Sequence, residues 1–353
     1  MNKPPDRIRR PTRNDVARRA NVSGWTVSNV LNGRNNVSIS EQTRRRVLEA
    51  AEWLGYQPNN SARALATGQT RTIGFWMCLG YSRYRSHVLH RMQQLIRQSD
   101  FEIVIRDIEE GLHRDGDPSN VFRIPVDGVI AFDTPTAARM VAGMSLPFVS
   151  MGAYWTDETD HVGIDLYSGA VDAVKHLVDT GRRNIAYLLP RRETEADFDD
   201  PRIVAYTTTM REAGLPTRLI YAADLSLATS WRTVRQHVSK DRSIDGLLCH
   251  DDGMAFGAHR ALSDLGVAIG PEIALIGFDG IDETEYLSPP LTTIAQPAGQ
   301  MCETAWRFLR ARIEDPGRDP QQQTLPTKLV IRQSSMPAGA VSRPTLAVAN
   351  AVR

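Results

Sequence analysis

The sequence predicts an α/β protein with a three-helix N-terminal head, built around a helix-turn-helix, and a large two-lobed body of parallel sheets. Three observations predict this fold class: the pattern of residues 12–33, the division of charge along the chain, and the alternation of apolar strands with helices after residue 72. At 353 residues with 41% hydrophobic content, the chain is long enough to form both parts.

The head begins with two short helices joined by a tight turn. Thr12 and Asp15 form a capping-box pattern at the first helix, and Ser23 is placed to cap the second. The apolar residues of both helices share one side, whereas the polar side of the second helix is expected to carry Gly24, Trp25, Ser28, Asn29 and Asn32. Two crossed helices with such an outward face have the geometry that enters a DNA major groove.

A third helix is predicted over residues 41–54, with Ser40 as its cap and Gly55 at its end. Its helically spaced apolar residues, expected to close a three-helix core, are Val47, Leu48, Ala51 and Leu54.

The segment that follows is predicted to contain a very short helix. Pro58 breaks the chain, Asn59 can cap, and residues 60–66 precede Gly68. A helix of about two turns is marginal in water, so the segment is either an ordinary polar linker or a hinge that folds on DNA. In the second case Leu65 is placed to wedge between base pairs in the minor groove.

The charge distribution supports a polyanionic partner for the head. Residues 1–71 carry 13 Lys and Arg against 5 Asp and Glu, whereas the remaining residues carry 29 against 36. Phosphate neutralisation dominates nucleic-acid affinity, so a basic head on an acidic body predicts DNA binding.

Several classes of protein are excluded or disfavoured. No stretch approaches the ~18 uninterrupted apolar residues of a membrane span, and the N-terminal residues lack the apolar region of a secretory signal. Three widely spaced cysteines, Cys78, Cys249 and Cys302, fit reduced thiols in a cytoplasmic protein. Motifs of phosphate-binding loops, hydrolase nucleophiles and zinc proteases are missing, so we expect no enzyme, catalytic residue, metal or cofactor.

The body alternates apolar runs with helices, as buried parallel sheets do. Strands are expected at 72–78, 101–107, 126–132, 147–152, 184–190, 218–223, 244–251 and 273–280. Helices are expected at 86–98, 170–181 and 254–266. Two sets of elements, at about 73–165 and 166–293, indicate two lobes.

Ligands of open α/β sheets bind outside the carboxyl ends of the strands. Charged and aromatic residues at those ends include Asp107, Asp133, Tyr154, Asp251 and Asp279. Carboxylates bind paired hydroxyls and an aromatic ring covers an apolar sugar face, so this set suits a polyhydroxylated ligand.

The run DVARRANVSGWTVSNVLNG, the segment TRRRVLEAAEWLGYQPNNSARALATGQTRTIGF and the later segments HLVDTGRRNIAYLLP, CHDDGMAFGAHRALSDLGV and IALIGFDGIDET occur in family order. With these the chain resembles the lactose/galactose repressor (LacI/GalR) family of bacterial transcription regulators along essentially its whole length. The resemblance implies a periplasmic-binding-protein-type, Rossmann-like effector body, with a C-terminal segment that returns through the first lobe and ends in the second.

The resemblance also implies roles for residues of the head. Phosphate-contacting positions are Thr12, Ser23, Thr26, Ser28 and Asn32. Base-reading positions are Gly24, Trp25 and Asn29, and hinge positions are Ala62 and Leu65. Asn59, the expected cap of the short helix, is a further candidate DNA contact. Where many family members carry Arg, this chain has Asn29, which suits adenine. Trp25 either contacts a thymine methyl group or packs within the head.

In the body, the resemblance implies that Arg202, Asp251 and Asp279 hold an effector, while Asp252 is at least as well explained as a helix cap. Tyr81 and Tyr84 replace the aromatic stretch that relatives use to stack on sugars, and Tyr154 is a further candidate. Arg83, Arg85 and Arg202 together favour an acidic or phosphorylated ligand.

The expected organisation is a DNA-binding domain at 1–58, a hinge at 59–71, an effector and dimerisation domain at 72–340, and a disordered tail at 341–353. The expected function is a sequence-specific regulator, a repressor of a carbohydrate-utilisation operon that responds to a sugar or sugar derivative. Its expected partners are double-stranded operator DNA and a second copy of the chain, with no membrane and no tail-mediated tetramer. The alternative is a regulator with a vestigial cleft and a protein partner.

Overall fold

The computed structural model describes residues 11–31, 38–56, 64, 68–78, 82–108, 125–134, 137, 145–153, 159–191 and 200–339. The chain divides into two compact units, Met1–Thr70 and Arg71–Arg353, which we call the head and the body. Among the described residues, no helix has both the length and the apolar character that a membrane span requires.

The head contains three helices, α1 (Arg13–Ala20), α2 (Gly24–Leu31) and α3 (Glu41–Leu54). The expected caps are confirmed: the backbone N–H groups of Asp15, Thr26 and Thr43 donate to the hydroxyls of Thr12, Ser23 and Ser40. The core consists of small apolar residues from all three helices, namely Val16, Ala17, Ala20, Val27, Val30, Val47, Ala50 and Ala51.

The prediction was wrong for one core residue of α3. Leu48 is 49% exposed, and Ala50 takes the inward position instead. The inward stripe of α3 is Val47, Ala50, Ala51 and Leu54, so Leu48 lies to one side of it.

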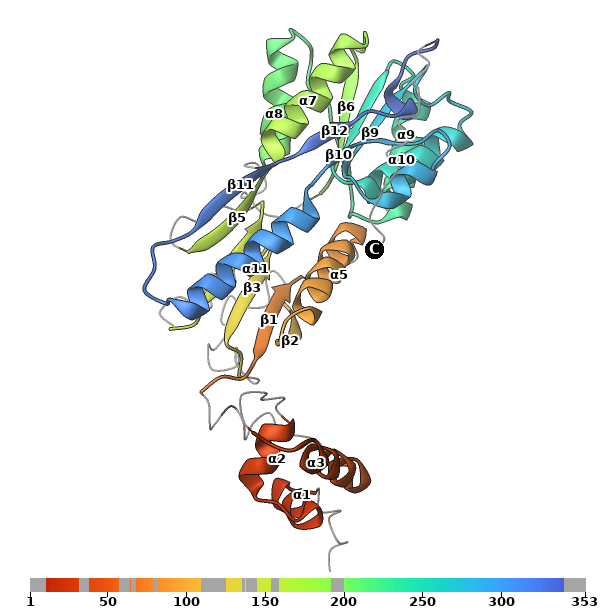
Figure 1. Ribbon diagram of the computed structural model, residues 1–353. Helices are drawn as coiled ribbons and strands as arrows, with labels where there is room; N and C mark the ends of the chain where they lie inside the picture. The colour runs from red at the N-terminus through yellow and green to blue at the C-terminus, as the bar shows by residue number, and fades with distance from the viewer. Residues whose placement is uncertain are drawn as a thin grey trace, which may run out of the picture. The chain divides into compact units, whose positions relative to one another are not determined.

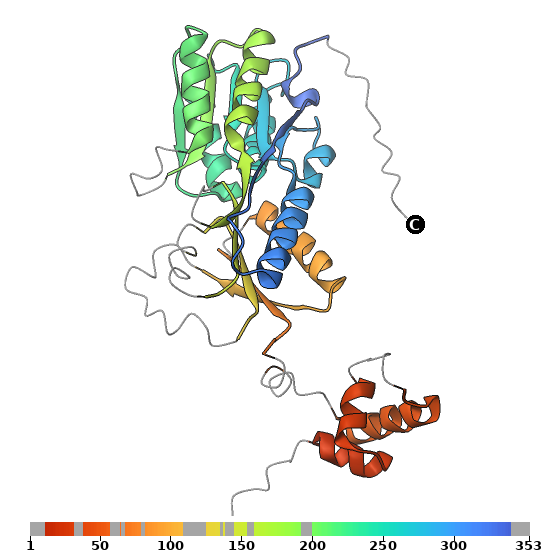
Figure 2. The same cartoon turned by 60° about the vertical axis from the view of Figure 1, so that its left-hand side comes forward.

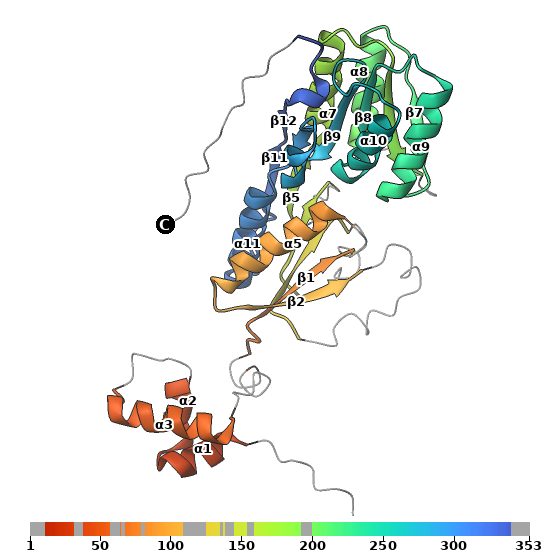
Figure 3. The same cartoon turned by 90° about the vertical axis from the view of Figure 1, so that its right-hand side faces the viewer.

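The first lobe of the body has a six-stranded sheet in the order β11-β5-β4-β3-β1-β2, with all neighbours parallel. Its strands are β1 (Thr72–Met77), β2 (Glu102–Asp107), β3 (Gly128–Phe132), β4 (Phe148–Gly152), β5 (Asp160–Asp165) and β11 (Gln322–Pro326). Helices α5 (Arg83–Arg97) and α11 (Ala298–Glu314) lie side by side on one face (Figures 1 and 3).

The second lobe has a sheet in the order β12-β10-β9-β8-β6-β7, parallel except for β12. Its strands are β6 (Ile185–Pro190), β7 (Leu219–Ala222), β8 (Gly246–Cys249), β9 (Ala274–Asp279), β10 (Thr292–Ala295) and β12 (Lys328–Val330). Helices α7 (Leu166–Asp179) and α8 (Pro201–Glu212) cover one face, and α9 (Leu227–Lys240) and α10 (Asp252–Asp264) cover the other (Figure 1).

The chain passes between the lobes three times: from β5 to α7, from β10 to α11, and from β11 to β12. Figure 2 accordingly shows the late, blue helix α11 beside the early, orange and yellow elements of the first lobe. The predicted fold class, with its return of the C-terminal segment through the first lobe, is therefore confirmed. Two short 3-10 helices, η3 (Asp282–Tyr286) and η4 (Gln333–Ser335), complete the second lobe.

Candidate functional site

Two surfaces carry the candidate functional residues, one in the head and one in the body. In the head, the first residues of α2 form an outward surface that the side chain of Arg13 from α1 contacts. Trp25 is 62% exposed there, so it does not pack within the head core. Ser23 and Thr26 are tied together at the start of the helix, with 2.9 Å between their hydroxyl oxygens.

Asn29 does not lie on this outward face, and its expected position was wrong. Its side chain is 4% exposed, and its Nδ2 donates to the backbone oxygen of Trp25 at 2.9 Å, one turn earlier in α2. The Asn29 amide therefore forms a hydrogen bond within α2 and does not face outward. Expected DNA-binding residues Asn32, Asn59, Ala62 and Leu65 lie outside the described residues, although Ala64 is helical and accepts a hydrogen bond from Gly68 N at 2.7 Å.

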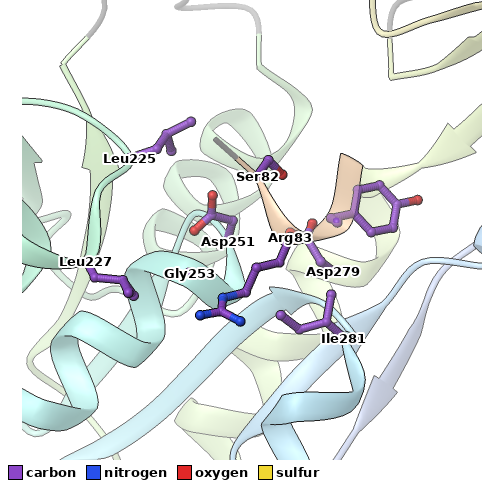
Figure 4. A pocket seen from close by; sticks show the side chains of 9 residues that line it. Ser82, Arg83, Leu225, Leu227, Asp251, Gly253, Asp279 and Ile281 are labelled. Atoms are coloured by element: carbon purple, nitrogen blue, oxygen red, sulfur yellow. The ribbon is translucent and has the colours of Figure 1, made fainter. Parts of the chain in front are cut away.

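In the body, a pocket lies between elements of the two lobes (Figure 4). The first lobe contributes the start of α5, and the second lobe contributes the start of α9, the start of α10 and the end of β9. The lining residues are Ser82, Arg83, Tyr84, Leu225, Leu227, Asp251, Gly253, Asp279 and Ile281. The pocket thus lies outside the carboxyl ends of β1, β8 and β9, where open α/β sheets bind ligands.

Asp251 and Asp279 line the pocket, as expected from the sequence. Asp251 caps α10 by accepting a hydrogen bond from Met254 N at 2.6 Å, and burial raises its pKa. Asp279 ends β9 with φ 120°, a left-handed conformation that is strained for any residue but glycine. Gln296 Nε2 donates to its Oδ1 at 2.8 Å, and burial, with the charges of Asp251 and Asp252, raises its pKa well above the usual value.

Asp252 lies behind the pocket and supports it, without being one of the lining residues. Its two carboxylate oxygens accept hydrogen bonds from Thr293 Oγ1 at 2.7 Å, Gly280 N at 2.8 Å and Ile281 N at 3.0 Å. Burial raises its pKa to about 7 even against these three bonds. Asp252 therefore holds the β9–η3 turn that carries Asp279 and Ile281.

Arg202 lies beside the pocket lining. Its Nε and Nη2 pair with both oxygens of Asp200, at 3.0 and 2.7 Å, and its Nη1 donates to His250 O at 3.1 Å. Burial acts to raise the pKa of Asp200, but the charge and hydrogen bonds of Arg202 outweigh it and hold that pKa below its usual value. The sequence reasoning missed Asp200, whose position before Pro201 signals only a helix start.

Tyr84 lines the pocket and is 6% exposed. Its ring packs edge-to-face on Phe132 with centroids 6.0 Å apart, while its hydroxyl is buried with no hydrogen-bond partner among the described residues. Burial, together with the charges of Asp279 and Asp133, raises the pKa of this hydroxyl. The other candidate tyrosines, Tyr81 and Tyr154, lie outside the described residues.

Arg83 extends from α5 toward the second lobe (Figure 4). Its Nη1 pairs with Glu283 at 2.9 Å, and its guanidinium carbon lies 5.7 Å from the centre of the Phe256 ring. Arg85 donates to the backbone oxygen of Cys78 at 3.4 Å. In the described part of the chain, no group of three or more His, Cys, Asp or Glu side chains is arranged to hold a metal ion.

Comparisons with known proteins agree with this architecture. Residues 12–59 match the family model of bacterial regulatory proteins of the lacI family, and residues 174–335 match that of the periplasmic binding protein-like domain. The transcriptional repressor PurR of Shigella sonnei (strain Ss046), a helix-turn-helix protein, is 29% identical over 329 residues, covering 91% of this chain and 95% of PurR.

Two solved structures of similar proteins match this chain over both the head and the body. The Lac repressor bound to ONPG in its repressed state has a TM-score of 0.77 and 25% identity, over 92% of this chain and 100% of that one. The complex of the transcriptional regulator CelR with cellobiose has a TM-score of 0.65 and 25% identity, over the same shares. The head of this chain therefore matches the lacI family of bacterial regulatory proteins, and over nearly its whole length the chain is similar to DNA-binding transcriptional regulators.

Proposed function

We propose that the protein is a dimeric repressor that binds a two-fold symmetric operator and is controlled by a neutral, hydroxyl-rich effector of the carbohydrate type. The observation that carries the effector part is the pocket at the carboxyl ends of β1, β8 and β9, lined by Asp251, Asp279 and Tyr84. Similarity to PurR, a transcriptional repressor, supports repression, and the cellobiose complex of CelR supports a sugar.

The polar groups of the pocket suit hydroxyl ligands. Among the described residues, Met254 N donates to Oδ1 of Asp251 and Gln296 Nε2 donates to Oδ1 of Asp279, so the Oδ2 atoms have acceptor capacity for ligand O–H groups. The buried Tyr84 hydroxyl supplies a further polar group for pairing. Opposite them, Leu225, Leu227 and Ile281 provide an apolar surface for the carbon skeleton.

The charge balance favours a neutral ligand over an acidic or phosphorylated one. Two of the three arginines named from the sequence are already neutralised by protein carboxylates, because Glu283 pairs with Arg83 and Asp200 pairs with Arg202. The third, Arg85, donates to the backbone oxygen of Cys78; burial raises the pKa of Asp251, and the charge of Arg85 acts against that rise. Asp251 and Asp279 both line the pocket. A dianionic phosphate placed there would oppose the ionisation of these two carboxyl groups, whereas a neutral hydroxyl can pair with either their charged or their protonated form.

A thermal-shift screen of the full chain tests the effector class, with neutral sugars, sugar acids, sugar phosphates and nucleosides. A ligand at 100-fold its Kd adds about 2.7 kcal/mol of stability. We expect hits among the neutral sugars, and we expect Asp279→Asn to lose them while exposed Asp172→Asn on α7 keeps them. Stabilisation by sugar phosphates alone would contradict a neutral effector. A screen without hits would leave the alternative of a vestigial pocket and a protein partner.

Operator binding and dimerisation are tested separately from the effector. Selection from randomised duplexes, followed by sedimentation of the complex, should yield a two-fold symmetric site that holds two chains. Recovery of an asymmetric site bound by one chain would contradict the dimer.

A further inference from the structure

The first residue of α1 reaches across the head to the outward surface of α2. Arg13 follows the cap residue Thr12, and its side chain is exposed. Its Nη1 donates to Ser28 Oγ at 3.2 Å, so the guanidinium lies over the second turn of α2. This partner is a neutral hydroxyl, and no carboxylate of the described head forms an ion pair with Arg13.

A glycine at the start of α2 makes room for this arrangement. A Cβ atom added at Gly24 would lie 3.3 Å from Arg13 Nε and 3.7 Å from its Cζ. The first distance is shorter than ordinary van der Waals contact between such atoms, and any longer side chain would occupy the volume that the guanidinium fills. Gly24 and Ser28 therefore form a shallow seat, one helical turn long, in which Arg13 lies.

The inward turn of Asn29 leaves the outward surface of α2 without a long polar side chain of its own. Trp25, Ser28 and Gly24 remain there among the described residues, and none of them carries a fork of donors. Arg13, which belongs to the neighbouring helix α1, supplies such a fork, a pair of parallel N–H donors. Its position coincides with the N-terminal turns of the second helix, which are the turns that approach base edges in helix-turn-helix proteins.

We propose that Arg13, supplied by α1 and seated on Gly24 and Ser28, is a specificity-determining residue that reads guanine in each operator half-site. A guanidinium donates two parallel hydrogen bonds to O6 and N7 of guanine, a pattern that other bases do not offer in the major groove. The inference rests on the proposed operator binding by the head and assigns the base preference to a residue outside the recognition helix.

The test is selection of binding sites from randomised duplexes by the full-length protein and by Arg13→Met, which keeps length and helix propensity. We expect the parent protein to enrich guanine at one position of each half-site and the variant to lose that preference alone. Affinity for the parent site should fall roughly 5- to 150-fold per half-site, the worth of one bidentate contact.

Two further variants separate base reading from charge. Arg13→Lys keeps the charge without the planar fork, so its guanine preference should weaken while its salt dependence stays. Arg18→Met removes a 79% exposed cation from the same helix and should leave every base preference intact. An unchanged selected site for Arg13→Met, with uniform loss of affinity across sequences, would make Arg13 a phosphate contact and overturn the inference.

Failure of the underlying function gives a different result. If the parent protein enriches no sequence at all, operator binding itself is contradicted, and the assignment of Arg13 falls with it. If the parent enriches a site without guanine in its half-sites, operator binding stands and only the inference is wrong.

Discussion

The head surface and the body pocket use arginine in opposite ways. Arg13 lies exposed on α2 and contacts a neutral hydroxyl, whereas Arg202 is buried and bound to both oxygens of Asp200. An exposed, unneutralised cation is available to an external polyanion at little cost to folding. A buried, paired cation is part of the scaffold. The difference shows that residue type alone does not identify a ligand contact. Whether an arginine can bind a ligand depends on whether a carboxylate of the protein already pairs with it.

The largest expected effect comes from breaking the buried pair. Arg202→Met leaves the Asp200 carboxylate buried without its cation, and such a loss costs about 3–5 kcal/mol in the free energy of unfolding. The pair side chains are only 12% and 9% exposed, so solvent screens them little. Urea unfolding of the body measures the change.

The matched control is Asp200→Asn combined with Arg202→Met, because Asn still caps α8 and carries no charge. Most of the lost stability should return in this double variant. If Arg202→Met unfolds at the same urea concentration as the parent, Arg202 is not a scaffold residue and the contrast with Arg13 disappears.

A second prediction concerns a buried histidine in the body. His161 in β5 is 1% exposed, and burial lowers its pKa to about 4 from the ordinary 6.5. The folded state therefore binds this proton less readily than the unfolded state, and stability present above pH 6.5 is lost as pH falls toward 4. The loss approaches about 3 kcal/mol.

Chemical unfolding at pH 7 and pH 4.5 measures this effect. His161→Gln should flatten the difference between the two pH values, whereas Gln in place of the exposed His90 should leave it as in the parent. An equally steep acid loss in His161→Gln would assign the pH dependence to other groups.

The smallest expected effect on stability sharpens the comparison within the head. Trp25→Ala removes a 62% exposed side chain and should change the free energy of unfolding by no more than about 0.5 kcal/mol while weakening operator binding. Asn29→Ala removes a buried hydrogen bond and should cost about 1 kcal/mol. Thermal unfolding and anisotropy titration on one operator distinguish the two; a large stability loss in Trp25→Ala would place Trp25 in the scaffold.

Much of the fold was predictable because local chemistry determined it. Thr12, Ser23 and Ser40 cap helices in the structure as their positions indicate, and the central strands of both sheets are apolar runs. Four strands were not predicted, two at one end of each sheet: β5 and β11 in the first lobe, and β10 and β12 in the second. β11 contains Gln322 and Gln323 and buries only Leu325, and β12 has three residues, so neither carries a clear pattern.

The position of the candidate site was predictable from the sequence, whereas the ion pairs and hydrogen bonds between its side chains were less so. Strand ends placed Asp251 and Asp279 at the pocket, since parallel strands bring their carboxyl ends together. The Arg202–Asp200 pair and the inward turn of Asn29 depend on three-dimensional contacts that helical spacing does not specify. In a helix as short as the eight residues of α2, consecutive residues can lie on opposite faces, so the spacing does not decide whether Asn29 faces the core or the outside.

The two lobes are completed by adjacent stretches of the chain, because β11 and β12 are separated by Thr327 alone. During synthesis, the head has all three helices once residue 54 has emerged, whereas both sheets await residues 322–330. At ribosomal speeds the interval is roughly 15–50 s. Every newly made molecule therefore passes through a stage in which its DNA-binding unit is finished and its regulatory unit is not. A chain that ends before residue 322 would remain at that stage, lacking one strand from each lobe.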